Sequence, residues 1–168
     1  HSLDAERAVL GSILIDPDAI LLVERDLAAG DFYHETHRWV YEALLDLHHA
    51  HRGLDFVTIT DELEKRGQLA NIGGPSEITA LMNAPPTSVH VADYAHIMRR
   101  TACQRRIIQA AGKIAKVAHV GESDLDSMCM ECQRLLTAAL PRAQSHSHLS
   151  GDDALVGYEA NQLRRAKR

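Results

Sequence analysis

Eleven histidines in a chain of 168 residues make metal binding the first chemistry to consider, because imidazole is a common metal ligand. The densest groups are His34-x-x-His37, with Glu35 between them, and His48-His49-x-His51. On a helix His34 and His37 would share a face, but no H-E-x-x-H motif or distant carboxylate completes a tetrahedral ligand set. The pattern favours surface histidines near helix ends, and we predict no metal site.

Three cysteines, an odd number, argue against a disulfide scaffold and favour a reducing compartment. Cys129 and Cys132 form a C-x-x-C motif, which in other contexts serves redox chemistry or zinc binding. Here no second C-x-x-C and no βαβ pattern accompanies it, and it falls on the apolar stripe of an expected helix. We therefore interpret both cysteines as structural residues of a helical core.

Nucleotide hydrolysis needs a loop of backbone N–H groups that cradles phosphate, and the chain has neither G-x-x-x-x-G-K-[ST] nor G-x-G-x-x-G. The Gly73-Gly74 pair is followed by Pro75, which has no backbone donor. We predict no catalytic residues and no bound cofactor. No apolar run approaches the ~18 residues of a membrane span, and no signal peptide is present, so we expect a cytoplasmic protein.

Basic side chains recur between residues 99 and 116 and invite a nucleic-acid hypothesis. They are Arg99, Arg100, Arg105, Arg106, Lys113 and Lys116. Aromatic side chains for base stacking are missing from this series, and the arginines wrap round a helix instead of forming one stripe. Residues 1–90 carry a net charge of −9 and residues 91–168 a net charge of +4. This asymmetry fits either separate faces for separate partners or an ordinary solvated surface.

The elements that must position these side chains are all predicted to be helices, with Leu, Ile, Val and Ala building the core. Expected ranges are 4–15, 17–27, 34–49, 56–66, from 75 to the proline pair at 85–86, and 89–119. Asp4 is expected to cap the first helix and Pro17 to open the second. The Val-Thr-Ile run at 57–59 favours a strand locally, but helix formers continue to residue 66. We predict an all-α fold.

The helix predicted from residue 89 is too long for the rest of the chain to cover. Thirty-one residues at a rise of about 1.5 Å span roughly 46 Å, whereas the first 87 residues should form a globule with a radius of gyration of about 12 Å. Its second half must project. Gly121 ends it, Ser123 and Asp126 restart a helix that runs to Leu140, and the two helices form a hairpin. Residues 1–104 are then the head and residues 105–140 the hairpin.

A hairpin of two helices buries only one stripe on each, which is marginal for stability. Packing against the hairpin of a second copy would complete a four-helix bundle, with Gly112 as a point of close approach. The residues expected in self-association are Ile107, Ile108, Ala111, Ile114, Met128, Leu135 and Leu136.

After a polar linker at 141–151, residues 152–168 are predicted to form a thinly apolar helix that docks elsewhere through Leu155, Tyr158 and Leu163. The chain lacks an initial Met and stops inside a charged helix, so we expect it to be part of a longer protein.

With this layout in place, several motifs in order resemble the N-terminal domain of the DnaB family of bacterial and phage replicative helicases. They are Asp4 through Ile15, Asp31-Phe-Tyr33 with His37, Asp55 through Leu63, Arg66-Gly-Gln-Leu69 with Gly73-Gly74, Ser88 through Ala95, and Arg105-Arg-Ile-Ile108. The resemblance covers residues 3 to about 140. It implies a six-helix globular head, a projecting hairpin and a linker helix that packs on a neighbouring motor domain.

The resemblance also implies a function. Six chains would assemble as a trimer of dimers, forming a collar that docks primase or a helicase loader. ATP and Mg²⁺ would bind an absent motor domain that moves 5′ to 3′ along DNA. The face expected to dock primase or loader comprises Lys113, Lys116, Glu122, Asp126, Glu131 and Arg134. The leading hypothesis is thus a non-catalytic assembly domain; the alternatives are a stand-alone nucleic-acid-binding or regulatory protein and, last, a histidine-metal enzyme.

Overall fold

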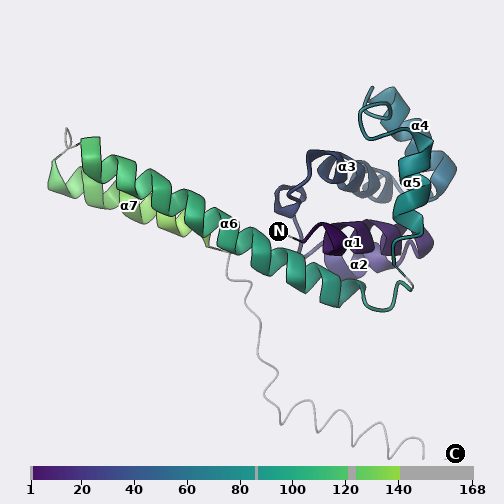
Figure 1. Cartoon of the computed structure of the whole chain (residues 1–168), viewed down its shortest axis with the longest axis horizontal. Helices are drawn as coiled ribbons and strands as arrows, with labels where there is room; N and C mark the ends of the chain where they lie inside the picture. Colours follow the sequence, from purple (N-terminus) through teal and green to yellow (C-terminus); the bar gives the residue numbers. More distant parts are fainter. Residues whose placement is uncertain (1, 86, 121–123, 141–168) are drawn as a thin grey trace, which may run out of the picture.

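One helix, α6 (Val91–Val120), runs through both parts of the molecule: its first half lies along a head and its second half projects from it (Figure 1). The computed structural model describes residues 2–85, 87–120 and 124–140. These residues form seven α-helices and a short 3-10 helix, with no strand, so the predicted all-α class is confirmed. None of the helices in these ranges is both long and apolar enough to cross a membrane.

The head is built from six helices, counting the first half of α6, and one 3-10 turn. In chain order the other elements are α1 (Leu3–Ile15), α2 (Ala19–Val23), η1 (Ala29–Asp31), α3 (Glu35–His49), α4 (Phe56–Lys65) and α5 (Pro75–Met82). The predicted linker at 141–151 and the last helix at 152–168, with Leu155, Tyr158 and Leu163, lie outside the described residues, as does Glu122.

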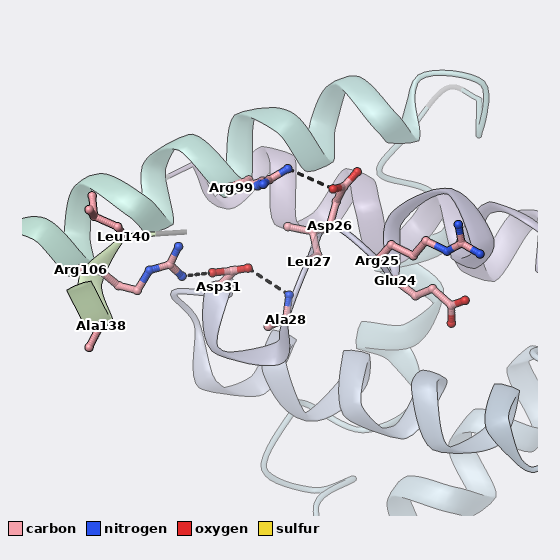
Figure 2. Close-up of a pocket in the computed structure, with 10 residues that line it drawn as sticks. All are labelled: Glu24, Arg25, Asp26, Leu27, Ala28, Asp31, Arg99, Arg106, Ala138 and Leu140. Carbon is pink, nitrogen blue, oxygen red and sulfur yellow. Dashed lines mark hydrogen bonds and ion pairs between the residues drawn. The ribbon is translucent and has the colours of Figure 1, made fainter. Parts of the chain in front are cut away.

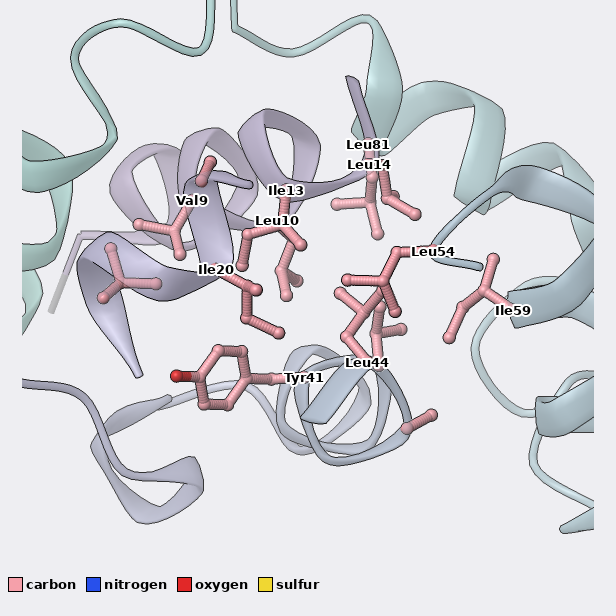
Figure 3. Packing of buried hydrophobic residues seen from close by; sticks show 14 of the residues in the cluster. Val9, Leu10, Ile13, Leu14, Ile20, Tyr41, Leu44, Leu54, Ile59 and Leu81 are labelled. Atoms are coloured by element: carbon pink, nitrogen blue, oxygen red, sulfur yellow. The ribbon is translucent and has the colours of Figure 1, made fainter. Parts of the chain in front are cut away.

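The core of the head surrounds α1, which contacts α2, α3, α5 and α6. Leu10 and Ile13 of α1 are fully buried and face Tyr41 and Leu44 of α3 (Figure 3). Aliphatic side chains fill most of this core, as the composition predicts. Tyr41 is the exception; its hydroxyl donates a hydrogen bond to the carbonyl oxygen of Leu27 at 3.2 Å, and burial raises its pKa well above the usual value.

Three local predictions about helix ends are wrong. The hydroxyl of Ser2, not the carboxylate of Asp4, caps α1 by accepting from the Ala5 N–H at 3.3 Å. The expected helix at 17–27 is reduced to the five residues of α2, because only its inner face packs on the core while Leu21 is 52 % exposed and Leu22 is 61 % exposed. The second hairpin helix, α7 (Leu125–Ala139), is capped by Asp124 and not, as predicted, by Ser123; Ser123 and Gly121 lie outside the described residues.

The backbone just before α3 is held by a distant side chain, the carboxylate of Glu6 in α1. This carboxylate is only 2 % exposed, and it accepts hydrogen bonds from the backbone N–H of Tyr33 at 2.6 Å and of His34 at 3.3 Å. The His37 Nδ1 lies 2.8 Å from it, and must carry the proton because a carboxylate can only accept. Burial by itself raises the pKa of Glu6, but these hydrogen bonds outweigh it and hold the pKa below its ordinary value.

Candidate protein-interaction surface

The projecting hairpin consists of the second half of α6 packed against α7. Ala110 and Ala139 are 5 % exposed where the two helices meet. Ile114, Met128 and Leu135 are half-buried along the same contact. Three of the seven side chains predicted to bind a second copy therefore serve mainly to join the two helices of the hairpin to each other.

The other four predicted residues point outward. Ile108 is 72 % exposed, Leu136 is 46 % exposed and Ile107 is 38 % exposed, and Ala111 is also exposed. Successive residues of an α-helix advance by about 100°. Ile107 and Ala111 consequently lie on one side of the buried line through α6, and Lys113 lies on the other.

The hairpin thus has two different flanks. We call the apolar flank the exposed side that carries Ile107, Ile108, Ala111, Ala115 and Ala118 of α6 with Leu125, Cys129 and Leu136 of α7. The C-x-x-C motif straddles its edge, with Cys132 half-buried and Cys129 exposed. The prediction that both cysteines are core residues is therefore wrong for Cys129, because two helices can cover only one stripe of each other.

The opposite side is the basic flank, which carries Arg106, Gln109, Lys113 and Lys116 of α6 with Arg134 of α7. Glu131 and Arg134, both predicted for docking, form an ion pair with bonds of 2.6 and 2.7 Å, and Arg134 holds the pKa of Glu131 below its usual value. Lys113 and Lys116 are exposed nearby, whereas Asp126 is exposed at the other end of α7. The structure brings together Lys113 and Arg134, which line one groove.

A second cavity, of about 410 Å³, lies where the hairpin joins the head (Figure 2). Two ion pairs cross this junction: Arg99 contacts Asp26 at 3.0 Å, and Arg106 contacts Asp31. Asp31 is only 6 % exposed, and its carboxylate also accepts from the Ala28 N–H at 3.0 Å. These contacts hold the base of the hairpin against the loop before α3.

Arg105 adds to this junction. Its guanidinium donates to the backbone carbonyl oxygen of Asp31 at 2.9 Å and lies 5.6 Å from the centroid of the Tyr33 ring. The sequence alone does not reveal this joint, although Asp31-Phe-Tyr33 and Arg105-Arg-Ile-Ile108 stand out in it as separate motifs. More than 70 residues separate Asp31 from Arg106, and nothing in local periodicity connects them.

Two pairs of histidine rings lie side by side: His34 and His37, with centroids 5.1 Å apart, and His48 and His49, with centroids 5.8 Å apart. The Nδ1 of His37 is hydrogen-bonded to Glu6. The Nε2 atoms of His48 and His49 each lie 3.7 Å from the same oxygen of Glu24. Within residues 2–85, 87–120 and 124–140, no group of three or more His, Cys, Asp or Glu side chains is placed to hold a metal ion.

Gly73 and Gly74 both have positive φ angles, of 105° and 74°, and lead directly into α5.

The fold is an all-helical domain with a packed head and an arm that presents one apolar and one basic flank. Comparison with known proteins identifies which one. The chain belongs to the family of DnaB-like helicase N-terminal domains, whose family model matches residues 1–100. The crystal structure of the N-terminal domain of DnaB helicase from Mycobacterium tuberculosis is similar, with a TM-score of 0.79 and 34 % identity over 82 % of this chain and 97 % of that one.

Two longer relatives match nearly the whole chain. The replicative DNA helicase DnaC of Bacillus subtilis is 31 % identical and DnaB of Geobacillus stearothermophilus 34 % identical, each over 156 residues, or 93 % of this chain. The chain spans 34 % of the length of either relative. A solved DnaB-like replicative helicase, described with its interactions with primase, shares the fold at a TM-score of 0.69 and 22 % identity, over 96 % of this chain and 35 % of that one.

Proposed function

We propose that this chain is the assembly and docking domain of a cytoplasmic replicative helicase. The apolar flank of its hairpin pairs with the same flank of a second copy, and the resulting dimers join into a hexameric collar. The collar docks primase or a helicase loader. Residues 152–168 would carry Leu155, Tyr158 and Leu163 onto a neighbouring motor domain, which binds ATP and Mg²⁺ and moves 5′ to 3′ along DNA.

Self-association is supported above all by the exposed apolar flank, which lies on an arm that the head does not cover. Ile108 and Leu136 are large aliphatic side chains exposed by 72 % and 46 %, and Ala111 and Ala115 extend the same surface. Contiguous apolar surface of this kind marks protein interaction sites. A symmetric pair of copies would bury the flank against itself, which is the common geometry of homodimers.

The docking role is supported by the basic flank and by the similarity to a helicase described with its primase interactions. The nucleic-acid alternative is weaker than the sequence implies. Arg99 and Arg106 are ion-paired with carboxylates of the head, and Arg105 is bonded to Asp31. Three of the six basic residues between 99 and 116 are therefore already engaged within the chain.

Ile108→Asp is expected to dissociate the dimer while the head stays folded. The new carboxylate would lose its water in the paired interface but not in the monomer, where residue 108 is 72 % exposed. We expect the affinity of one copy for another to fall 100-fold or more, or by about 3 kcal/mol. Multi-angle light scattering at tens of micromolar should give a dimer mass for the parent chain and a monomer mass for the variant.

Val57→Asp provides the matched control, because Val57 is 73 % exposed on α4, away from the hairpin. Its mass should equal that of the parent chain. A monomeric parent chain, or a dimer that tolerates Ile108→Asp, would count against pairing through the apolar flank. The parent chain and the two variants should all fail to hydrolyse ATP in a coupled phosphate-release assay.

A further inference from the structure

A groove of about 220 Å³ runs between α6 and α7 on the basic flank. Its floor is apolar and made of small or half-buried side chains: Ala110, Leu135, Ala138 and Ala139. Its rim is formed by hydrogen-bond donors: Arg106, Gln109, Lys113 and Arg134. An apolar floor between cationic rims matches a ligand that is apolar along one line and acidic on either side of it.

The side chains of the rim differ in how many partners they already have. The side chains of Lys113 and Gln109 have no hydrogen-bond or ion-pair partner among the described residues. Arg134 is paired with Glu131 at the surface, and Arg106 with the buried Asp31. Lys113 is therefore the charge that an incoming carboxylate would meet first, and Arg134 could exchange its exposed partner for another carboxylate at little cost.

We propose that this groove binds an acidic amphipathic helix of a partner protein, with apolar side chains seated on the alanine and leucine floor and carboxylates at Lys113 and Arg134. The inference rests on the proposed docking function and names its chemistry and its place. The groove is smaller than the roughly 300–1,000 Å³ of small-molecule sites, so it fits side chains of a protein segment. It has no aromatic lining on which nucleic-acid bases could stack.

The test uses the 168-residue chain labelled with ¹⁵N and three probes: a leucine- and glutamate-rich amphipathic helical peptide, the same peptide with every Glu replaced by Gln, and a 15-nucleotide oligo-dT strand. The Glu peptide should shift the amide resonances of Gln109, Lys113, Arg134 and Ala138. The Gln peptide should bind at least tenfold more weakly, and Lys113→Glu should weaken the Glu peptide about tenfold. Arg100→Glu makes the same charge change on the head portion of α6 and should leave the affinity unchanged.

Three outcomes would overturn the proposal: no shift at millimolar Glu peptide, equal binding of the Glu and Gln peptides, or tighter binding of oligo-dT to the same residues. The last outcome would make the groove a nucleic-acid surface. Light scattering on the same samples separates this test from the proposed assembly function. Lys113→Glu should remain dimeric, because Lys113 lies on the flank opposite Ile107 and Ala111, so loss of the groove and loss of the dimer are measured independently.

Discussion

Replacing Glu6 by alanine is expected to lower the free energy of unfolding by about 3 kcal/mol, because a buried carboxylate that accepts several hydrogen bonds is lost. The substitution leaves two backbone donors just before α3 and the His37 Nδ1–H without their acceptor. Urea unfolding followed by circular dichroism at 222 nm measures the change. Glu35→Ala removes an exposed carboxylate at the first position of α3 and should cost less than about 0.5 kcal/mol.

The same carboxylate predicts how stability depends on pH. The pKa of Glu6 is lower in the folded chain than its ordinary value of 4.5, so its contribution is complete above that value. As the pH falls below 4.5, Glu6 becomes protonated in the unfolded chain before it does so in the folded chain, which lowers the free energy of unfolding. The stabilisation that Glu6 provides is lost as the pH falls through its folded pKa. The stability difference between the parent chain and Glu6→Gln should therefore shrink as the pH falls below about 4.5. A difference that grows on acidification would contradict the role assigned to Glu6.

Gly11→Ala is expected to destabilise the head by about 2–3 kcal/mol, although alanine is the better helix former. Gly11 lies where α1 passes α5. A methyl group there would come within 2.1 Å of the carbonyl oxygen of Leu81 and 2.5 Å of the Cδ of Pro85. A backbone carbonyl and a proline ring have little freedom to turn aside, so α5 and the residues after it must shift away from α1 and loosen the packing of these two helices. Thermal unfolding should show the loss as a fall of several degrees in Tm.

Gly112→Ala is the matched control, since it makes the same change in another helix. Apart from the backbone of α6 itself, no atom of the described residues lies within 4 Å of a methyl group at this position, so the variant should gain up to about 1 kcal/mol from helix propensity. A loss of stability at Gly112 similar to that at Gly11 would show that backbone effects, not contact with α5, explain the first result. The expected close approach of Gly112 to a second copy stays a prediction; the described residues of one chain place nothing against it.

Much of the architecture was predictable because it depends on local signals. Gly53, Gly67 and Pro85 lie between helices. Asp55 caps α4 through the Thr58 N–H at 2.9 Å despite the strand-forming Val-Thr-Ile that follows. The projection of α6 followed from comparing its length with the size of the head. The order of motifs also indicated the family, which the comparison with known proteins confirms.

The chain's own sequence therefore determined which segments are helical, that one helix must project, and that its hairpin carries more apolar surface than two helices can bury. Only the tertiary structure decided which of these side chains remain exposed. It placed Ile114 and Leu135 inside the hairpin, Ile108 and Leu136 on its apolar flank, and Lys113 on the opposite side. The same holds for Glu6, Gly11 and Asp31, whose roles depend on partners 27 or more residues away. Periodicity reports the side of a helix on which a residue lies; what packs against that side is decided by distant segments of the chain.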